Sequence, residues 1–366
     1  MYSFQPSEEQ QMLVDAIKRY AMDDLRAAAR DADEEGQLPP ELIEKGWELG
    51  YLQASIPEDY FGFGERSAVT GVLAVEELAY GDLSGTLAMM TPGLFTTPIL
   101  LAGSEEQKKE FIPPVIEMEW KAYTAALMEH SFDFDPNELK TVADADADGD
   151  SYVLTGEKTY VPFADGAEAF IVYAALDGVT QGLIVPGDAE GLEVGERQKL
   201  LGLNALPLYS LKLEGVRVPK ANRLGGDEGH DMAPIMAAAN VALAAMAVGV
   251  SKAALDYAIE YAKDREVFGV KVAQKQAIAF LIAEMGTEIE AIRLLAWEAA
   301  WMIDEGMDEA PKLAYLALSG AIDTTMMVTD RAVQILGGHG YIREHPVEMW
   351  MRNGRGFATF SGLAMV

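Results

Sequence analysis

Three patterns of apolar residues follow one another along this 366-residue chain, and their order limits the folds that it can adopt. Apolar residues recur at helical spacing from residue 8 to 50, from 68 to 80 and from 104 to 111. Short β-rich runs then replace them, and a helical pattern returns from about residue 233. The sequence therefore predicts an α+β protein in three parts: a helical domain at residues 1–121, a β domain at 122–232 and a helical domain at 233–366.

Long helical runs fill the third part, with few turn residues inside them, and cover residues 236–263, 272–304, 311–337 and roughly 346–352. The clearest strands of the middle part are short and are separated by Gly, Asp or Pro; they cover residues 152–156, 169–173, 182–185 and 210–213. Strands of this length and spacing favour a small antiparallel sandwich or barrel. No stretch has the composition of a linker between independent modules.

One acidic run, residues 144–149 (DADADG), is similar to the start of a calcium-binding loop. The twelfth position of such a loop would be Thr155 rather than a glutamate that binds with two oxygens, and the flanking residues predict strands rather than helices. We interpret the run as a solvated hairpin turn. The chain has no cysteine and its four histidines are scattered, so no metal site is expected.

Charge and the N-terminal residues limit the partners. Acidic residues outnumber basic ones 59 to 28, for a net charge of −31, which argues against nucleic acid or an anionic membrane as a partner. An anionic ligand would need locally placed cations. The first residues lack the basic start and apolar run of a signal peptide, and the longest apolar stretch, residues 241–250, is too short to span a bilayer. We expect a cytoplasmic protein.

Four short strings point to a family. They are residues 57–64 (PEDYFGFG), 103–108 (GSEEQK), 156–158 (GEK) and 215–219 (GVRVP). In this order and spacing they resemble the acyl-CoA dehydrogenase family along nearly the whole chain. The resemblance implies an N-terminal helical domain, a central antiparallel β domain and a C-terminal four-helix bundle, usually assembled as a dimer of dimers. It also implies FAD and the α,β-dehydrogenation of acyl-CoA thioesters.

In that family FAD lies across a subunit boundary, and the neighbouring subunit holds its adenosine diphosphate part. The resemblance places the residues of this grip in residues 265–269 (REVFG) and 334–341 (QILGGHGY), at Arg265, Phe268, Gln334 and Gly338. The chemistry is appropriate, because a guanidinium can bind two pyrophosphate oxygens and glycine lets the backbone approach a phosphate closely. An aromatic ring such as Phe268 can face the adenine.

The half of the site that would hold the flavin ring on the same chain departs from the family pattern. Residues 126–135 (ALMEHSFDFD) take the place of the family's Thr-Glu-Pro-Gly-Ala-Gly-Ser-Asp loop, and Met128 stands where a threonine hydroxyl would bond the ring. In the next strand YVPF replaces Trp-Ile-Thr-Asn, and Pro162 has neither a hydroxyl nor a backbone N–H. Each lost donor costs ~1–3 kcal/mol. We expect bulky side chains to fill the vacated space: Phe132, Phe134 and Phe163.

Neither position that supplies the catalytic base in the family holds a carboxylate. Ser361 stands at the usual glutamate position, and Ala239 stands at the alternative one on a helix. On the same helix Ala237 and Asn240 replace an acid and an arginine that face the thioester. A serine hydroxyl is no base near neutral pH without a neighbour to take its proton. We therefore predict no catalytic residue on this chain.

We interpret the chain as the non-catalytic subunit of a heteromeric acyl-CoA dehydrogenase, with FAD shared with a partner subunit. The partner would be a catalytic paralogue, or a second copy of the chain, and acyl-CoA would bind in the complex. An electron-transfer flavoprotein is a candidate electron acceptor, and fatty acyl or steroid side chains are candidate substrates. One alternative is a homomeric flavoenzyme that uses Asp133, Asp135 or His130 as acid or base, for example in an elimination. Another is a scaffold without a ligand.

Overall fold

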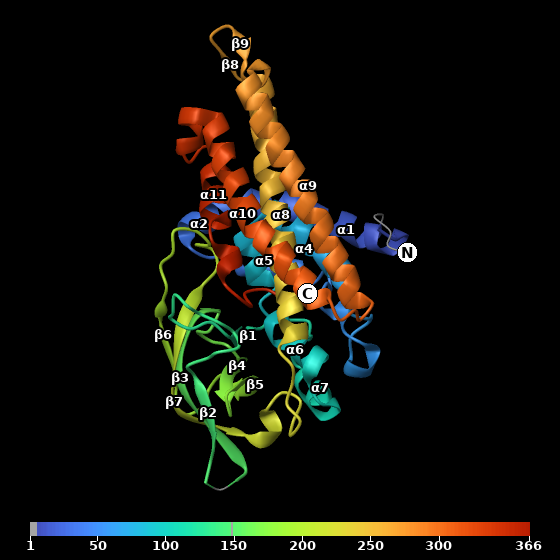
Figure 1. Ribbon diagram of the computed structural model, residues 1–366, viewed down its shortest axis with the longest axis vertical. Coiled ribbons are helices and arrows are strands. Elements are labelled where there is room, and N and C mark those ends of the chain that lie inside the picture. The colour runs from blue at the N-terminus through green and yellow to red at the C-terminus, as the bar shows by residue number, and fades with distance from the viewer. Residues whose placement is uncertain (1–5, 148) are drawn as a thin grey trace.

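The computed structural model describes residues 6–147 and 149–366, in three packed parts (Figure 1). The first is all helical: α1 (Glu8–Tyr20), α2 (Arg26–Glu35), α3 (Pro40–Trp47), α4 (Ala68–Gly81), α5 (Leu83–Met89), α6 (Gly93–Ala102) and α7 (Glu105–Phe111). Local signals fix several of its ends. Ser7 and Ser104 each form a reciprocal capping box with the glutamine three residues later, and Pro40 occupies the first turn of α3.

The middle part is a seven-stranded sheet formed by β1 (Tyr123–Ala126), β2 (Val142–Ala145), β3 (Ser151–Pro162), β4 (Ala169–Leu176), β5 (Val179–Pro186), β6 (Leu192–Arg197) and β7 (Leu208–Pro219). Its order is β1-β4-β2-β3-β7-β6, and β5 pairs with β4. The sheet is mostly antiparallel, as predicted, but β4 pairs in parallel with both β1 and β2. The acidic run joins β2 to β3 in an antiparallel hairpin, as expected, although Asp148 lies outside the described residues.

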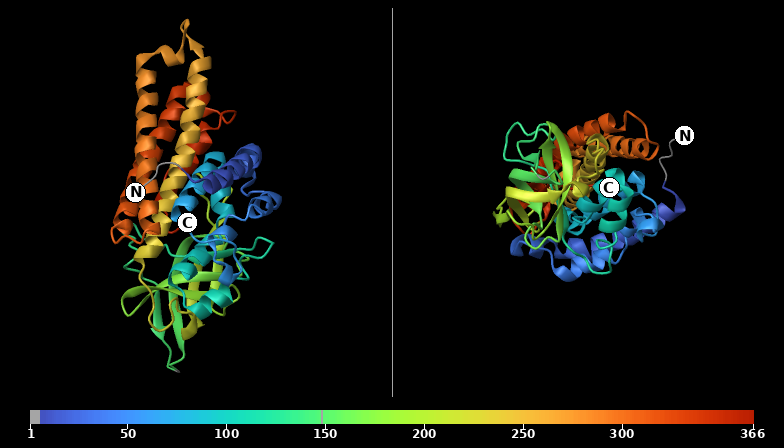
Figure 2. Two further views of the ribbon diagram at one scale, coloured as in Figure 1. Left: turned by 90° about the vertical axis from the view of Figure 1, so that its right-hand side faces the viewer. Right: turned by 90° about the horizontal axis from the view of Figure 1, so that it is seen from below.

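The third part is the helical bundle. It contains α8 (Ala233–Asp264), α9 (Gln276–Asp304), α10 (Ala310–Leu336) and the short α11 (Val347–Gly354). Together, α8 and α9 extend beyond the rest of the molecule as an arm, and the hairpin of β8 (Glu266–Val267) and β9 (Val270–Lys271) joins them at its tip (Figures 1 and 2). The predicted limits between the domains fall in the connections before β1 and before α8.

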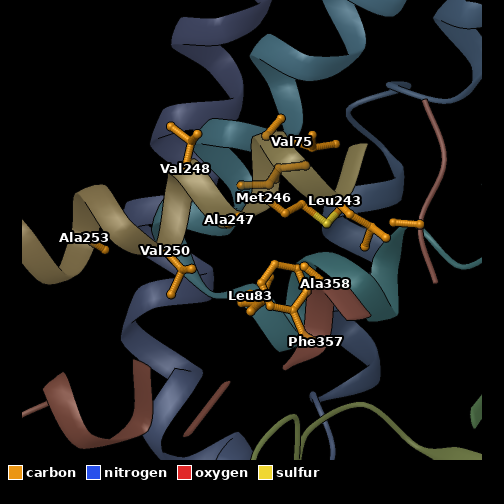
Figure 3. Packing of buried hydrophobic residues seen from close by; sticks show 14 of the residues in the cluster. Val75, Leu83, Leu243, Met246, Ala247, Val248, Val250, Ala253, Phe357 and Ala358 are labelled. Atoms are coloured by element: carbon orange, nitrogen blue, oxygen red, sulfur yellow. The ribbon is translucent and has the colours of Figure 1, made fainter. Parts of the chain in front are cut away.

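Helix α8 is the centre of the molecule. It packs against α4, α9 and α10, and the residues of its first half are mostly apolar and mostly buried. Figure 3 shows Leu243, Met246 and Val250 of α8 among side chains from α4 and from residues 357–358. By length and composition α8 could cross a membrane, but 83% of its most apolar window is buried in the protein. This burial is what the central helix of a bundle requires.

The buried carboxylate of Asp82 makes the stability of the fold depend on pH. Asp82 precedes α5, and its carboxylate accepts a hydrogen bond of 2.6 Å from the backbone N–H of Gly85. Burial raises the pKa of Asp82 to about 6 from an ordinary value of about 3.9. The folded protein therefore holds the proton more tightly than the unfolded chain. Stability from this group is complete below the unfolded pKa and is lost as the pH rises through the folded pKa.

We expect Asp82→Asn to remove this pH dependence, because asparagine keeps the capping oxygen but does not ionise. Between pH 5 and 7.5 the free energy of unfolding of the wild type should fall, relative to the variant, by ~1.4 kcal/mol, about half of the full effect of this shift. Urea unfolding at several pH values measures how the free energy of unfolding of each protein changes with pH. Equal slopes for the two proteins would contradict the assignment.

Candidate functional site

The C-terminal ends of α8 and α10 lie together at the arm end of the bundle. The Tyr261 hydroxyl on α8 donates to the Leu336 carbonyl (3.3 Å) and is hydrogen-bonded to Nδ1 of His339 (3.0 Å). Two of the residues predicted to grip the nucleotide follow α8, and two lie at the end of α10. All of them are exposed: Arg265, Phe268, Gln334 and Gly338. Segments 70 residues apart in sequence therefore present the predicted grip on one end of the molecule.

The hairpin displays an aromatic ring. Phe268 is 94% exposed and has a φ of 56°, a left-handed conformation that is uncommon for a residue with a side chain. The Nζ atom of Lys275 lies 5.8 Å from the centroid of the ring. An aromatic face held beside a cation at the surface can stack on a planar, electron-rich ring system.

Cations gather around this ring on a chain that is otherwise strongly acidic. Residues 263–275, the arm tip, contain Lys263, Arg265, Lys271 and Lys275 against Asp264 and Glu266, for a local charge of +2. Lys263 pairs with Glu260, and Lys271 donates to the Asp264 carbonyl. Within the described residues the Arg265 guanidinium has no hydrogen bond or ion pair. The arm tip therefore supplies the local positive charge that an anionic ligand needs.

Glycine occupies the two positions after α10, Gly337 and Gly338, for different physical reasons. Gly337 has φ 58° and ψ −127°, a conformation that essentially only glycine adopts. A Cβ added at Gly338 would meet nothing within 4 Å, so packing inside this chain does not require a glycine there. The open space over Gly338 would let another molecule approach the backbone closely.

At the predicted cradle for the flavin ring, the chain's own side chains and backbone groups contact one another. The Tyr160 ring stacks on Phe360, with centroids 4.4 Å apart and planes at 12°. The Tyr160 N–H donates to Oε1 of Gln198 (3.1 Å), and the Thr159 N–H donates to the Met128 carbonyl (2.9 Å). The face of the ring and the backbone donor that this strand could offer a flavin are therefore occupied.

The prediction that three phenylalanines fill the cradle is wrong for Phe132, whose side chain is fully exposed in the loop between β1 and β2. Phe163 instead packs edge-on against Trp120 (5.0 Å), and Phe134 packs partly buried against the neighbouring apolar cluster. The ring that covers Tyr160 is Phe360, which the sequence analysis missed. Its place directly before Ser361 was the available signal.

A buried ion pair fixes the loop that follows β1. The Lys158 ammonium is fully buried, lies 2.8 Å from Oε1 of Glu129 and donates to the Leu127 carbonyl (3.1 Å). Glu129 also accepts the N–H groups of Lys140 and Thr141. Burial, opposed by Glu129, lowers the pKa of Lys158 to about 8. Lys158 and Glu129 are both engaged in these bonds, so they hold the loop in place, and neither of the two is free to act as an acid or a base.

Ser361 stands at the position of the family's glutamate. Its hydroxyl is partly exposed and has no hydrogen-bond partner among the described residues. Ala239, at the alternative position of the base, is buried on α8 beside Ala237 and Asn240. Neither Ser361 nor Ala239 is a carboxylate. Of the alternative acids and bases, Asp133 bonds Ser131 and Asp135 bonds Asn137, while His130 is exposed.

Comparison with known proteins accounts for the arrangement of the three parts. Three family models match the chain in succession: the N-terminal domain of acyl-CoA dehydrogenase at residues 7–119, its middle domain at 124–216 and its C-terminal domain at 233–364. The chain belongs to the acyl-CoA dehydrogenase family. The fold predicted from the resemblance, with its helical, β and bundle domains, is thus confirmed.

Relatives within the acyl-CoA dehydrogenase family match over almost the full length. The caffeyl-CoA reductase-Etf complex subunit CarC of Acetobacterium woodii is 33% identical over 98% of this chain and 96% of its own. The mitochondrial short-chain specific acyl-CoA dehydrogenase of Sus scrofa is 33% identical over 98% and 88%. The structure of butyryl-CoA dehydrogenase from Megasphaera elsdenii has a TM-score of 0.89 at 30% identity, over 99% and 96%.

Proposed function

We propose that this chain is the non-catalytic subunit of a heteromeric, FAD-dependent acyl-CoA dehydrogenase. It contributes Arg265, Phe268, Gln334 and Gly338 to FAD whose flavin ring rests on a catalytic partner subunit. One asymmetry carries the proposal. The chain closes its own ring cradle with Phe360, yet leaves the four nucleotide-gripping residues exposed, at the arm tip and at the end of α10.

The residues at the cradle do not fit a flavin ring. Phe360 lies against Tyr160 at stacking distance, Pro162 has no N–H, and Met128 has no hydroxyl. A buried polar ring without its donors loses ~1–3 kcal/mol for each bond that is not made. We therefore assign no flavin to this chain's own cradle, and no chemical step to its residues.

The residues at the arm tip and at the end of α10 do fit the nucleotide end of FAD. Arg265, which has no hydrogen bond or ion pair in the described part of the chain, can bind two pyrophosphate oxygens, and the surrounding lysines offset the acidity of the chain. Phe268 offers a face to the adenine, Gln334 offers an amide, and Gly338 allows close backbone approach. Bound in the partner's site, FAD supplies the redox group for the α,β-bond of an acyl-CoA thioester.

The other properties of the complex follow as parts of the same proposal. The partner carries the carboxylate base and the acyl-CoA site that this chain lacks. The electron acceptor is an electron-transfer flavoprotein; a relative named as a subunit of an Etf complex supports this choice. The location is cytoplasmic.

The FAD content of the purified protein tests the proposal. Produced alone, the chain should be colourless; produced with a catalytic paralogue, the complex should contain about one FAD for every two polypeptides. The visible absorption spectrum and the protein concentration give the ratio. A yellow protein made of this chain alone, with one FAD per polypeptide, would refute the proposal.

A further inference from the structure

Residues 363–366, the inner segment, run into the interior of the molecule directly after the Ser361 position. Their side chains are 1–7% exposed. Met365 belongs to an apolar cluster with Leu94 of α6, Leu127 after β1 and Ala239 of α8. The segment therefore lies among the helices and the strand end that surround the two base positions of the family.

The cavity that the inner segment itself lines is small. The cavity that Met365 and Val366 line has a volume of about 40 Å³, whereas a site for a small organic ligand needs roughly 300 Å³ or more. Four extended residues span at most about 14 Å, which is comparable to the length of a decanoyl chain. The segment therefore fills buried, apolar space, and its greatest possible length is that of such an acyl chain.

The surroundings are shaped to receive the segment. A Cβ on Gly71 of α4 would lie 2.6 Å from Cβ of Val366, closer than real side chains approach, so this glycine makes room for the segment. A guanidinium N–H of Arg66 donates to the Val366 carbonyl. A polar anchor and a missing side chain therefore both fix the position of the segment.

We propose that the inner segment is a built-in occupant of the acyl cavity of this subunit. The inference rests on the proposed non-catalytic role and deepens it, because the chain closes its acyl cavity as well as its ring cradle. The apolar side chains of the segment provide the burial that an acyl group would otherwise provide. The subunit consequently reaches its folded state without acyl-CoA and does not compete with its partner for substrate.

The first experiment displaces the segment without altering it. In Gly71→Ala the new methyl group collides with Val366, so the segment should leave the cavity. Chymotrypsin cleavage after Phe360, Leu363 or Met365, followed by mass spectrometry, should become at least ~10-fold faster, since cleavage tracks the open population. The matched control is Gly286→Ala, whose new Cβ would make only an ordinary contact at 3.8 Å. Cleavage of Gly71→Ala at the wild-type rate would overturn the proposal.

The second experiment tests for the cavity itself. Met365→Asp places a charge where Met365 is 2% exposed, so the segment should move out to water. Titration calorimetry with decanoate should then detect about one site per chain. The wild type and Met118→Asp, a change at a 95% exposed position, should show none. Absence of decanoate binding to both Met365→Asp and Gly71→Ala would refute the inference.

Neither measurement involves FAD. A yellow homomer would therefore contradict the proposed function but not the result of these titrations. A cavity that stays closed in both variants would contradict the inference and leave the FAD ratio of the complex unaffected.

Discussion

Replacing Arg265 by alanine is expected to release FAD from the complex that this chain forms with a catalytic subunit. The guanidinium is exposed and unpaired within the described residues, so its loss removes no contact of the fold itself. A charge-assisted hydrogen bond contributes ~1.5–3 kcal/mol, which corresponds to roughly 10- to 150-fold weaker FAD binding. Flavin absorbance after gel filtration should fall, and excess FAD should restore dehydrogenase activity.

Arg19→Ala is the matched control, because Arg19 is equally exposed on α1 and its loss changes the net charge by the same amount. The control complex should keep its flavin. If Arg265→Ala also keeps its flavin and activity, the chain does not hold the nucleotide. The alternative of a scaffold without a ligand would then be favoured.

The largest loss of stability is expected from removal of the buried carboxylate of Glu76. It lies on α4, is 2% exposed, and accepts hydrogen bonds from Lys252 of α8 (2.6 Å), Arg293 of α9 (3.1 Å) and the Trp297 indole (3.3 Å). Glu76→Leu leaves two cations without their common partner. Breaking a buried pair in this way costs ~3–5 kcal/mol. Since Lys252 and Arg293 keep 21% and 26% of their side-chain exposure, we expect the lower end, ~3 kcal/mol.

Chemical denaturation of the wild type and of the variant measures this difference. The control is Glu290→Gln, which removes a 58% exposed carboxylate that also lies near Arg293 (3.7 Å). A surface pair of this kind contributes ~0–1 kcal/mol. If the two variants lost equal stability, Glu76 would not link the N-terminal domain to the bundle as the contacts indicate.

Long helices could be predicted from the sequence, whereas two short and almost entirely buried helices could not. The runs at 236–263 and 311–337 correspond to α8 and α10 within three residues at either end. By contrast, every residue from 83 to 99 is buried, so α5 and α6 have no alternation of polar and apolar positions that a periodic pattern could reveal. Strand β6 was not predicted either, because its residues are mostly exposed and it has no buried apolar run.

In the candidate site, residues in short sequence strings could be predicted, whereas contacts between residues far apart in the sequence could not. The positions of Arg265 and Gly338 came from strings that resemble a family, and the structure brings them to one end of the bundle. The contact between Tyr160 and Phe360 joins residues 200 positions apart, and no local pattern encodes it. The burial of residues 363–366 has the same origin, because it depends on space that α4, α6 and α8 create together.

The cations of the arm tip make ionic strength act in an unusual direction. FAD is an anion that the chain as a whole repels, with its net charge of −31, and that the cations of residues 263–275 attract. At 0.15 M salt the Debye length is about 8 Å, so an FAD molecule near the arm tip interacts mainly with the charges of the tip itself. At 0.01 M it is about 30 Å, and the acidic bulk then opposes the approach. This chain's contribution to cofactor capture is therefore faster in moderate salt than in dilute buffer, the reverse of ordinary electrostatic steering.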